Sequence, residues 1–201
     1  MPAVGAGRSR AGMSDVLLFH HAQGLTDGVR AFADRLRAAG HQVTVPDLYD
    51  GHTYVTLEEG MAHAREVGFQ ALADRGMGAA DGMPDDLVYV GLSLGVMPAQ
   101  QLAQHRPGAR GAVLCFACVP AEEFGGPWPA GVRLQVHGME HDPVFADEGD
   151  LAAAEQLTAA VDGAELFVYP GDQHLFVDSS LSDHRPEAAE LLTRRVLDFL
   201  A

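Results

Sequence analysis

One pentapeptide, Gly91-Leu92-Ser93-Leu94-Gly95, has the G-x-S-x-G pattern in which a serine stands on a sharp turn between a strand and a helix. Such a turn strains the backbone at the serine, so the residues two positions away on either side have to be small, as Gly91 and Gly95 are. A serine hydroxyl held in this way can attack a carbonyl carbon. The backbone N–H of Leu94 would then point toward the oxygen that becomes negatively charged. The pattern therefore predicts that Ser93 is a nucleophile and that Leu94 contributes to an oxyanion hole.

A serine nucleophile needs a general base and a carboxylate that orients the base. When the nucleophile stands on this type of turn, the acid and the histidine follow it in that order, each in a loop after a strand. Asp142 follows an apolar run at 132–137, and His174 follows another at 164–169. We therefore expect His174 to be the base and Asp142 to orient it. Three rival carboxylates lie in the same two loops and stay open as alternatives: Glu140, Asp172 and Asp178.

The second oxyanion donor should come from the loop after the first strand, which reads His20-His21-Ala22-Gln23-Gly24. The N–H of Ala22 is the candidate, because Gly24 would allow the sharp turn that aims it. We also expect His21 to contact the substrate. Trp128 is a second candidate for such a contact, because it lies in a long loop at 117–131 that is rich in glycine and proline.

The elements that position these residues follow from the alternation of apolar runs with segments of helical period. The runs predict buried strands at 15–19, 42–46, 87–91, 111–116, 132–137 and 164–169. Helices are expected at 27–39, 56–74, 95–105 and 147–161, and from Pro186 onward. The predicted fold class is α/β, a mostly parallel sheet of about six strands in the order 2-1-3-4-5-6 with helices on both faces. We expect one domain at 14–201, preceded by a flexible extension at 1–13.

Composition excludes several classes of protein. The net charge is −15 and all thirteen basic residues are arginine, so a nucleic-acid partner is not expected. No apolar stretch approaches the roughly 20 residues of a membrane span, so no membrane partner is expected either. The start of the chain lacks a signal-peptide core, which makes a cytoplasmic location the expectation. The oligomeric state does not follow from the sequence.

Two further patterns have competing interpretations. Cys115 and Cys118 have the C-x-x-C spacing of a redox pair, but Cys115 ends an apolar strand, so small buried side chains are the favoured interpretation. His137 and His141 have the i, i+4 spacing of a zinc site on a helix, but the predicted strand at 132–137 and Gly138 argue against a helix there. The expected chemistry needs no metal and no cofactor.

Taken together, these segments resemble the dienelactone hydrolase family from about residue 14 to the end of the chain. Five segments occur in the family's order: FHHAQGL, AGHQVTVPDLY, GLSLG, an HGxxxDP-like segment and GDQHLF. The resemblance implies an α/β-hydrolase fold and hydrolysis of esters or lactones. It also implies a triad of Ser93, Asp142 and His174, with Ala22 and Leu94 as oxyanion donors.

Three positions depart from the family's founding enzymes. Those enzymes have a cysteine where this chain has Ser93, a glutamate where it has His21, and a carboxylate-binding arginine where it has Asp178. Because Asp178 would repel an anionic substrate, we expect a small neutral ester or lactone to be preferred. The expected function is therefore a serine hydrolase acting on a small-molecule ester or lactone. The alternatives are a non-catalytic binding protein with the hydrolase fold, and an acyltransferase that uses an alcohol or a peroxide.

Overall fold

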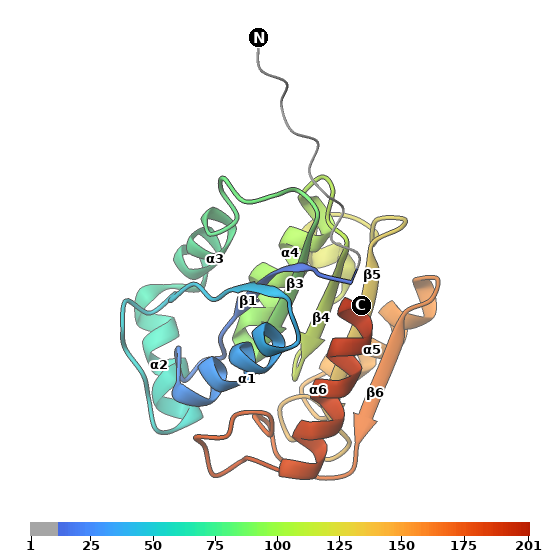
Figure 1. Cartoon of the computed structure of the whole chain (residues 1–201). Helices are drawn as coiled ribbons and strands as arrows, with labels where there is room; N and C mark the ends of the chain where they lie inside the picture. The colour runs from blue at the N-terminus through green and yellow to red at the C-terminus, as the bar shows by residue number, and fades with distance from the viewer. Residues whose placement is uncertain (1–11) are drawn as a thin grey trace.

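A single six-stranded sheet organises the computed structural model, which describes residues 12–201 (Figure 1). Every pair of neighbouring strands is parallel, and the strand order β2-β1-β3-β4-β5-β6 confirms the predicted topology. The strands are β1 (Asp15–Phe19), β2 (Gln42–Thr44), β3 (Leu87–Leu92), β4 (Gly111–Cys115), β5 (Arg133–Met139) and β6 (Glu165–Tyr169). Most of the predicted extension at 1–13 lies outside the described residues.

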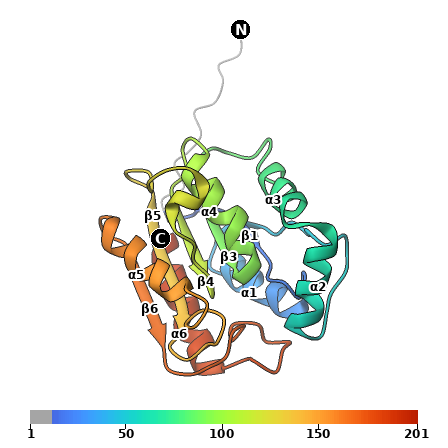
Figure 2. The same ribbon diagram turned by 180° about the vertical axis from the view of Figure 1, so that it is seen from behind.

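Helices cover both faces of the sheet (Figures 1 and 2). One face packs against α1 (Asp27–Ala38) and α6 (Pro186–Leu200), and the other packs against α2 (Leu57–Val67), α3 (Phe69–Gly78), α4 (Val96–His105) and α5 (Asp150–Ala160). The part of the chain that the structure describes also contains two short 3₁₀ turns, η1 (Ser93–Gly95) and η2 (Ala121–Phe124). Within residues 12–201, none of the helices combines the length and the apolar character that crossing a membrane requires.

The strands are continuous apolar runs because both faces of the sheet are covered. In β1, Val16 and Leu18 point into the core beneath α1 and α6, whereas Leu17 and Phe19 point into the core on the other face. All four side chains are completely buried. Burying each one is worth about 1.5–3 kcal/mol, so a polar side chain at any of these positions would be strongly destabilising.

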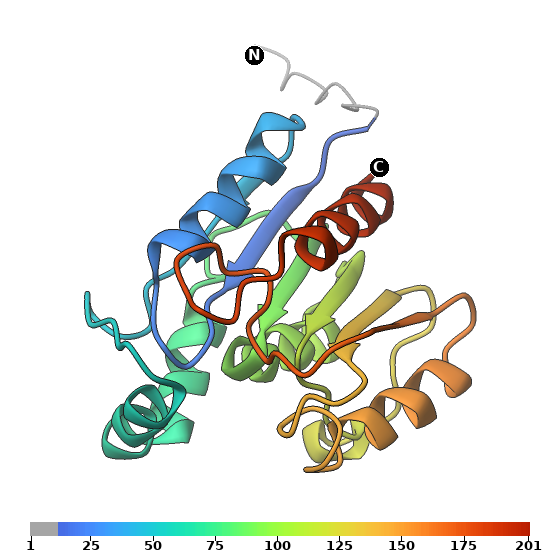
Figure 3. The same cartoon turned by 90° about the horizontal axis from the view of Figure 1, so that it is seen from below.

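The strand order reverses between β1 and β3, and this reversal determines where a site can form. From β1 the chain turns outward to β2, whereas from β3 it proceeds in the other direction to β6. Open α/β sheets bind ligands outside the carboxyl ends of the strands at such a switch point. Figure 3 shows the molecule from below, with the segment that follows β6 (orange to red) passing across this side toward the start of α1 (blue).

Several predicted boundaries differ from the structure. The helix expected over 56–74 is interrupted at Gly68, whose φ of 94° ends α2 and opens α3. The helix expected from residue 147 begins at Asp150, because Gly149 has a φ of 105° and cannot continue a helix. A capping box formed by Thr56 and Glu59 opens α2.

Candidate active site

Ser93 stands on a strained turn between β3 and α4. Its φ is 49°, in the left-handed region that residues with a side chain rarely adopt. A Cβ atom at Gly91 would lie 2.6 Å from the carbonyl oxygen of Gly95, and one at Gly95 would lie 2.5 Å from the carbonyl oxygen of Phe19. Both glycines are therefore required by close backbone contacts, and the turn is pressed against the end of β1.

The structure brings Ser93, His174 and Asp142 into one hydrogen-bonded chain. Ser93 Oγ lies 2.8 Å from His174 Nε2, and His174 Nδ1 lies 2.7 Å from Asp142 Oδ2. The other oxygen of Asp142 accepts the backbone N–H of Val144 at 2.9 Å. Asp142 is completely buried, whereas Ser93 keeps 9% of its surface exposed and His174 keeps 5%. Ser93 and His174 therefore keep a small exposed surface, while Asp142 is shielded from water.

The rival carboxylates take no part in this chain. Glu140 and Asp172 are exposed; Glu140 lies near His141, and Asp172 contacts its neighbour Gln173. Asp178 is completely buried and pairs with His21, whose Nε2 lies 2.8 Å from its Oδ2. The sequence-based expectation that Asp178 would repel a substrate carboxylate is therefore wrong, because this side chain faces the protein interior.

The loop after β1 is held by contacts on the α2 side of the sheet. Gln23 donates its side-chain amide to the carbonyls of Tyr54, at 3.1 Å, and Val55, at 2.8 Å. Its own carbonyl accepts the N–H of Tyr54 at 3.0 Å. A Cβ at Gly60 in α2 would lie 2.1 Å from the carbonyl oxygen of Ala22, so the Ala22 peptide rests directly on that helix.

The same loop lies beside the turn that follows Ser93. A Cβ at Gly95 would lie 2.7 Å from the carbonyl oxygen of His20, which places the start of the loop against η1. Ala22 and Leu94, the two candidate oxyanion donors, therefore belong to backbone segments that pack together. Ala22 is buried and Leu94 is partly exposed.

His20 organises the base of this loop. Its Nδ1 donates to the carbonyl of His21 at 2.8 Å, and its Nε2 accepts the N–H of Leu48 at 3.0 Å. Burial lowers the pKa of His20 to about 4, so the ring is neutral at neutral pH. This histidine is a structural connection between two loops.

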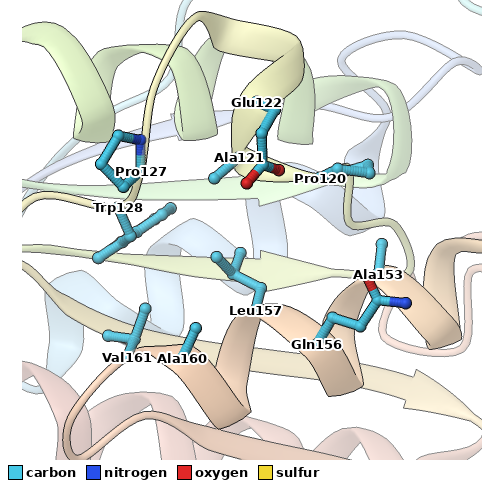
Figure 4. Close-up of a pocket in the computed structure, with 10 residues that line it drawn as sticks. All are labelled: Pro120, Ala121, Glu122, Pro127, Trp128, Ala153, Gln156, Leu157, Ala160 and Val161. Carbon is cyan, nitrogen blue, oxygen red and sulfur yellow. The ribbon is translucent and has the colours of Figure 1, made fainter.

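Neither predicted substrate contact is found at the site. His21 has no exposed surface; besides its contact with Asp178, its Nδ1 accepts the N–H of Gln23 at 3.2 Å. Trp128 donates its indole N–H to the carbonyl of Val132 at 2.7 Å, just before β5. It therefore lies toward the amino end of the sheet, where it lines a cavity of about 170 Å³ against α5 (Figure 4).

One carboxylate near His174 and Asp142 belongs to no recognisable sequence motif. Asp150, the first residue of α5, is half-buried and close enough to His174 and Asp142 for their charges to affect its ionisation. Burial raises the pKa of Asp150 to about 6, although the backbone N–H of Cys118 opposes this shift. Together with Asp142, it makes the surroundings of His174 acidic.

The cysteines and the histidine pair are structural. Cys115 and Cys118 are free and completely buried, and burial raises both thiol pKa values, that of Cys118 to about 12. His137 is buried on β5 and is bonded to Tyr169, whereas His141 is exposed in the next loop, so the i, i+4 spacing does not form a helical site. Among the described residues, no group of three potential metal ligands is found.

Comparison with known families gives a match along the whole sequence. The model of the dienelactone hydrolase family matches residues 1–201. The chain belongs to this family. Its membership agrees with the parallel six-stranded sheet and with the place of Ser93 at the end of β3.

Solved structures of dienelactone hydrolase-like proteins share the fold. A candidate dienelactone hydrolase from Klebsiella pneumoniae subsp. pneumoniae MGH 78578 superposes with a TM-score of 0.69 at 20% identity, over 96% of this chain and 89% of that one. A dienelactone hydrolase-like promiscuous phosphotriesterase from metagenomic libraries gives 0.69 at 17% identity, over 96% and 88%. A candidate α/β-superfamily hydrolase from Xanthomonas campestris pv. campestris gives 0.64 at 19% identity, over 94% and 96%. No curated protein sequence matches this chain significantly.

This member of the dienelactone hydrolase family has the family fold, and its structure shows the contacts of the three residues that differ from the founding enzymes. A serine occupies the strained turn, with a histidine in hydrogen-bond contact. The other two departures, His21 and Asp178, are partners of each other.

Proposed function

We propose that this chain is a serine hydrolase that cleaves small, neutral esters or lactones through an acyl-enzyme on Ser93. The observation that carries the proposal is the continuous contact of Ser93 with His174 and of His174 with Asp142, at 2.8 and 2.7 Å. A buried carboxylate, an imidazole and a hydroxyl in this sequence of contacts have the geometry of nucleophilic catalysis.

The hydrogen bonds assign the proton positions that the chemistry requires. The buried Asp142 accepts the proton on His174 Nδ1, which leaves Nε2 free to accept the Ser93 hydroxyl. A serine hydroxyl is far less acidic than a cysteine thiol, so Ser93 needs His174 as a true general base. The replacement of the family's cysteine by serine is therefore compatible with this pair of contacts.

The reaction then has two steps. In the first, Ser93 Oγ attacks the substrate carbonyl while His174 takes the hydroxyl proton and passes it to the leaving oxygen. The negative oxygen of the tetrahedral intermediate lies between the backbone N–H groups of Ala22 and Leu94. In the second, His174 takes a proton from water while the water oxygen attacks the acyl carbonyl. The bond to Ser93 Oγ then breaks, and His174 returns the proton to Ser93 Oγ, which releases the carboxylic acid.

The preference for a neutral substrate rests on the charges near the base. Asp142 and Asp150 both lie close to His174. At the position of the family's carboxylate-binding arginine this chain has Asp178, a buried side chain that cannot bind an anion. Hydrogen bonds to charged groups are each worth about 1.5–3 kcal/mol, so an anionic substrate would lose substantial binding energy. We expect a neutral ester to have a higher kcat/KM than a dienelactone of similar size. An equal or higher value for the dienelactone would contradict this preference.

A fluorophosphonate probe tests the nucleophile directly, because it reacts with activated serines. We expect mass spectrometry of the digested protein to find the label on the peptide that contains Ser93, and Ser93→Ala to abolish labelling. A purified wild-type protein that binds small esters but is neither labelled nor active would instead be a non-catalytic binding protein. Product analysis with added alcohol or peroxide separates hydrolysis from acyl transfer.

A further inference from the structure

His21, in the loop after β1 that carries Ala22, forms a second histidine–carboxylate pair with Asp178. His21 and Asp178 are both completely buried, and His21 Nε2 lies 2.8 Å from Asp178 Oδ2. No step of the proposed reaction uses either residue. Burying two ionisable groups is costly unless their hydrogen bonds are satisfied, so the pair needs a structural or functional explanation.

The contacts of the pair fix its protonation state. His21 Nδ1 accepts the N–H of Gln23, so the ring proton is on Nε2 and is donated to Asp178. Asp178 also accepts the hydroxyl of Thr26, together with the backbone N–H and hydroxyl of Ser180 at 2.8 and 2.6 Å. Burial, the largest influence, would raise the pKa of Asp178, but these side-chain hydrogen bonds lower it to about 2. The pair is therefore a neutral imidazole bound to a carboxylate.

The pair joins two loops that the sheet alone does not hold together. His21 immediately precedes Ala22 in the loop after β1, whereas Asp178 follows His174 by four residues in the segment after β6. Three strands, β3, β4 and β5, separate β1 from β6. The oxyanion donor and the general base thus come from distant strands, and the His21–Asp178 contact links their loops directly.

The surroundings of Asp178 leave it little freedom to move. Thr26 caps α1 by accepting the N–H of Val29 at 3.2 Å, so its contact with Asp178 connects that carboxylate to the start of the helix. A Cβ at Gly28 would lie 1.7 Å from Asp178 Oδ1, which shows how closely the first turn of α1 approaches the carboxylate. The linkage is therefore rigid.

We propose that His21 and Asp178 are positioning residues that hold the N–H of Ala22 in register with the His174 loop. The inference rests on the proposed hydrolase function, since Ala22 is a donor only if an oxyanion forms beside Ser93. A misplacement of about 1 Å in a catalytic constellation can lower the rate by about a hundredfold. Loosening the pair would therefore reduce kcat more than it changes KM, because the oxyanion develops only after the substrate has bound.

Two conservative substitutions separate the two hydrogen bonds of His21. The amide nitrogen of His21→Gln can still donate to Asp178, but nothing then accepts the N–H of Gln23. The amide oxygen of His21→Asn can accept that N–H, but the shorter side chain does not reach Asp178. We expect each to lower kcat on a neutral ester by about tenfold to a hundredfold, with KM changed by less than about threefold.

A boronate inhibitor gives a readout that a merely structural role would not move. It forms a tetrahedral adduct on Ser93, so its affinity should fall in parallel with kcat in both His21 variants, while binding of the ground-state ester does not. The matched controls are His141→Gln and Asp172→Asn, two exposed residues in the loops around the triad, and both should retain wild-type kcat. Assays are run well below the unfolding midpoint of each variant.

If the two His21 variants do not fold, Ser180→Ala provides a second test. Ser180 is exposed, yet it donates its hydroxyl to Asp178. Ser180→Ala should lower kcat in the same direction by a smaller factor. Folded His21 variants with wild-type kcat, or with a change in KM alone, would overturn the inference while leaving Ser93 as nucleophile. An active Ser93→Ala would instead overturn the proposed function and the inference together.

Discussion

Two buried histidine–aspartate pairs lie at the carboxyl edge of the sheet, and they differ in what the second ring nitrogen faces. The bond between imidazole and carboxylate is nearly the same, 2.7 Å for His174 with Asp142 and 2.8 Å for His21 with Asp178. The remaining nitrogen of His174 faces the hydroxyl of Ser93, whereas that of His21 accepts the backbone N–H of Gln23. The first imidazole can therefore take up a proton, while the second is already used as an acceptor.

An imidazole oriented by a carboxylate is therefore not in itself evidence of a general base. The two pairs differ in the group that contacts the second ring nitrogen of the histidine. They also differ in whether the histidine keeps a surface that a substrate could reach. Ser93 and His174 keep some exposed surface, whereas both members of the second pair have none. The first pair is suited to chemistry and the second to holding the loops that surround it.

Among the substitutions considered, Ser93→Ala should lower kcat the most. Removing the nucleophile leaves only oxyanion-hole and binding catalysis, so kcat should fall by several powers of ten. The measurement is steady-state hydrolysis of a neutral ester, with circular dichroism as the check on folding. A folded variant that keeps a tenth of wild-type turnover would place the nucleophile elsewhere.

Asp142→Asn should rank next and should separate the two pairs. Replacing the orienting carboxylate costs up to about four powers of ten where it has been tested in serine proteases. Asp178→Asn should cost less, because it disturbs positioning and not the ionisation of the base. Asp172→Asn, an exposed substitution in the His174 loop, is the control and should cost almost nothing. A greater loss from Asp178→Asn than from Asp142→Asn would reverse the roles of the two pairs.

The first pair was predictable from the sequence, whereas the second was not. Asp142 and His174 follow apolar runs that read as buried strands, and their order after Ser93 is that of the nucleophile-elbow fold. The contact of His21 with Asp178 spans 157 positions and follows no spacing rule. It arises only when the loops after β1 and β6 meet in space.

The errors in the fold prediction have similar physical causes. Apolar periodicity continues through Gly68, so the break between α2 and α3 depends on a backbone conformation that the pattern does not contain. Trp128 is predicted to contact the substrate because it lies in the long loop at 117–131, which is rich in glycine and proline. That loop has to return to the amino end of β5, however, and Trp128 lies on the returning part. Periodicity predicts the elements well, but it says little about loop paths.

The pair of His21 and Asp178 should also affect how the free energy of unfolding depends on pH in the acid range. The pKa of Asp178 is lowered to about 2, below the ~3.9 of an unfolded aspartate, so its ionisation stabilises the folded state above about pH 4. This contribution is lost as the pH falls from about 4 toward 2. In urea unfolding at pH 6 and pH 3, Asp178→Asn should therefore lose less stability between the two pH values than wild type. Asp172→Asn serves as the control, and an identical pH dependence in Asp178→Asn would contradict the assignment.

The smallest expected effect concerns the thiols. Burial raises the pKa of Cys118 to about 12 and that of Cys115 further, so neither thiolate is available near neutral pH. Iodoacetamide should leave activity almost unchanged in the folded protein and should modify both cysteines in urea. Rapid inactivation that tracks the modification of either cysteine would show that a thiol takes part in catalysis.

Trapping the acyl-enzyme shows directly whether Ser93 is the nucleophile. The protein is mixed with an ester whose acyl group deacylates slowly, quenched in acid within the first turnover, digested and analysed by mass spectrometry. If Ser93 is acylated, we expect one acyl mass increment on the peptide that contains Ser93, none in Ser93→Ala, and an adduct that decays at the steady-state turnover rate. An acyl group on any other residue, or full turnover with no adduct at Ser93 under a quench shown to preserve serine esters, would contradict the assignment of Ser93 as nucleophile.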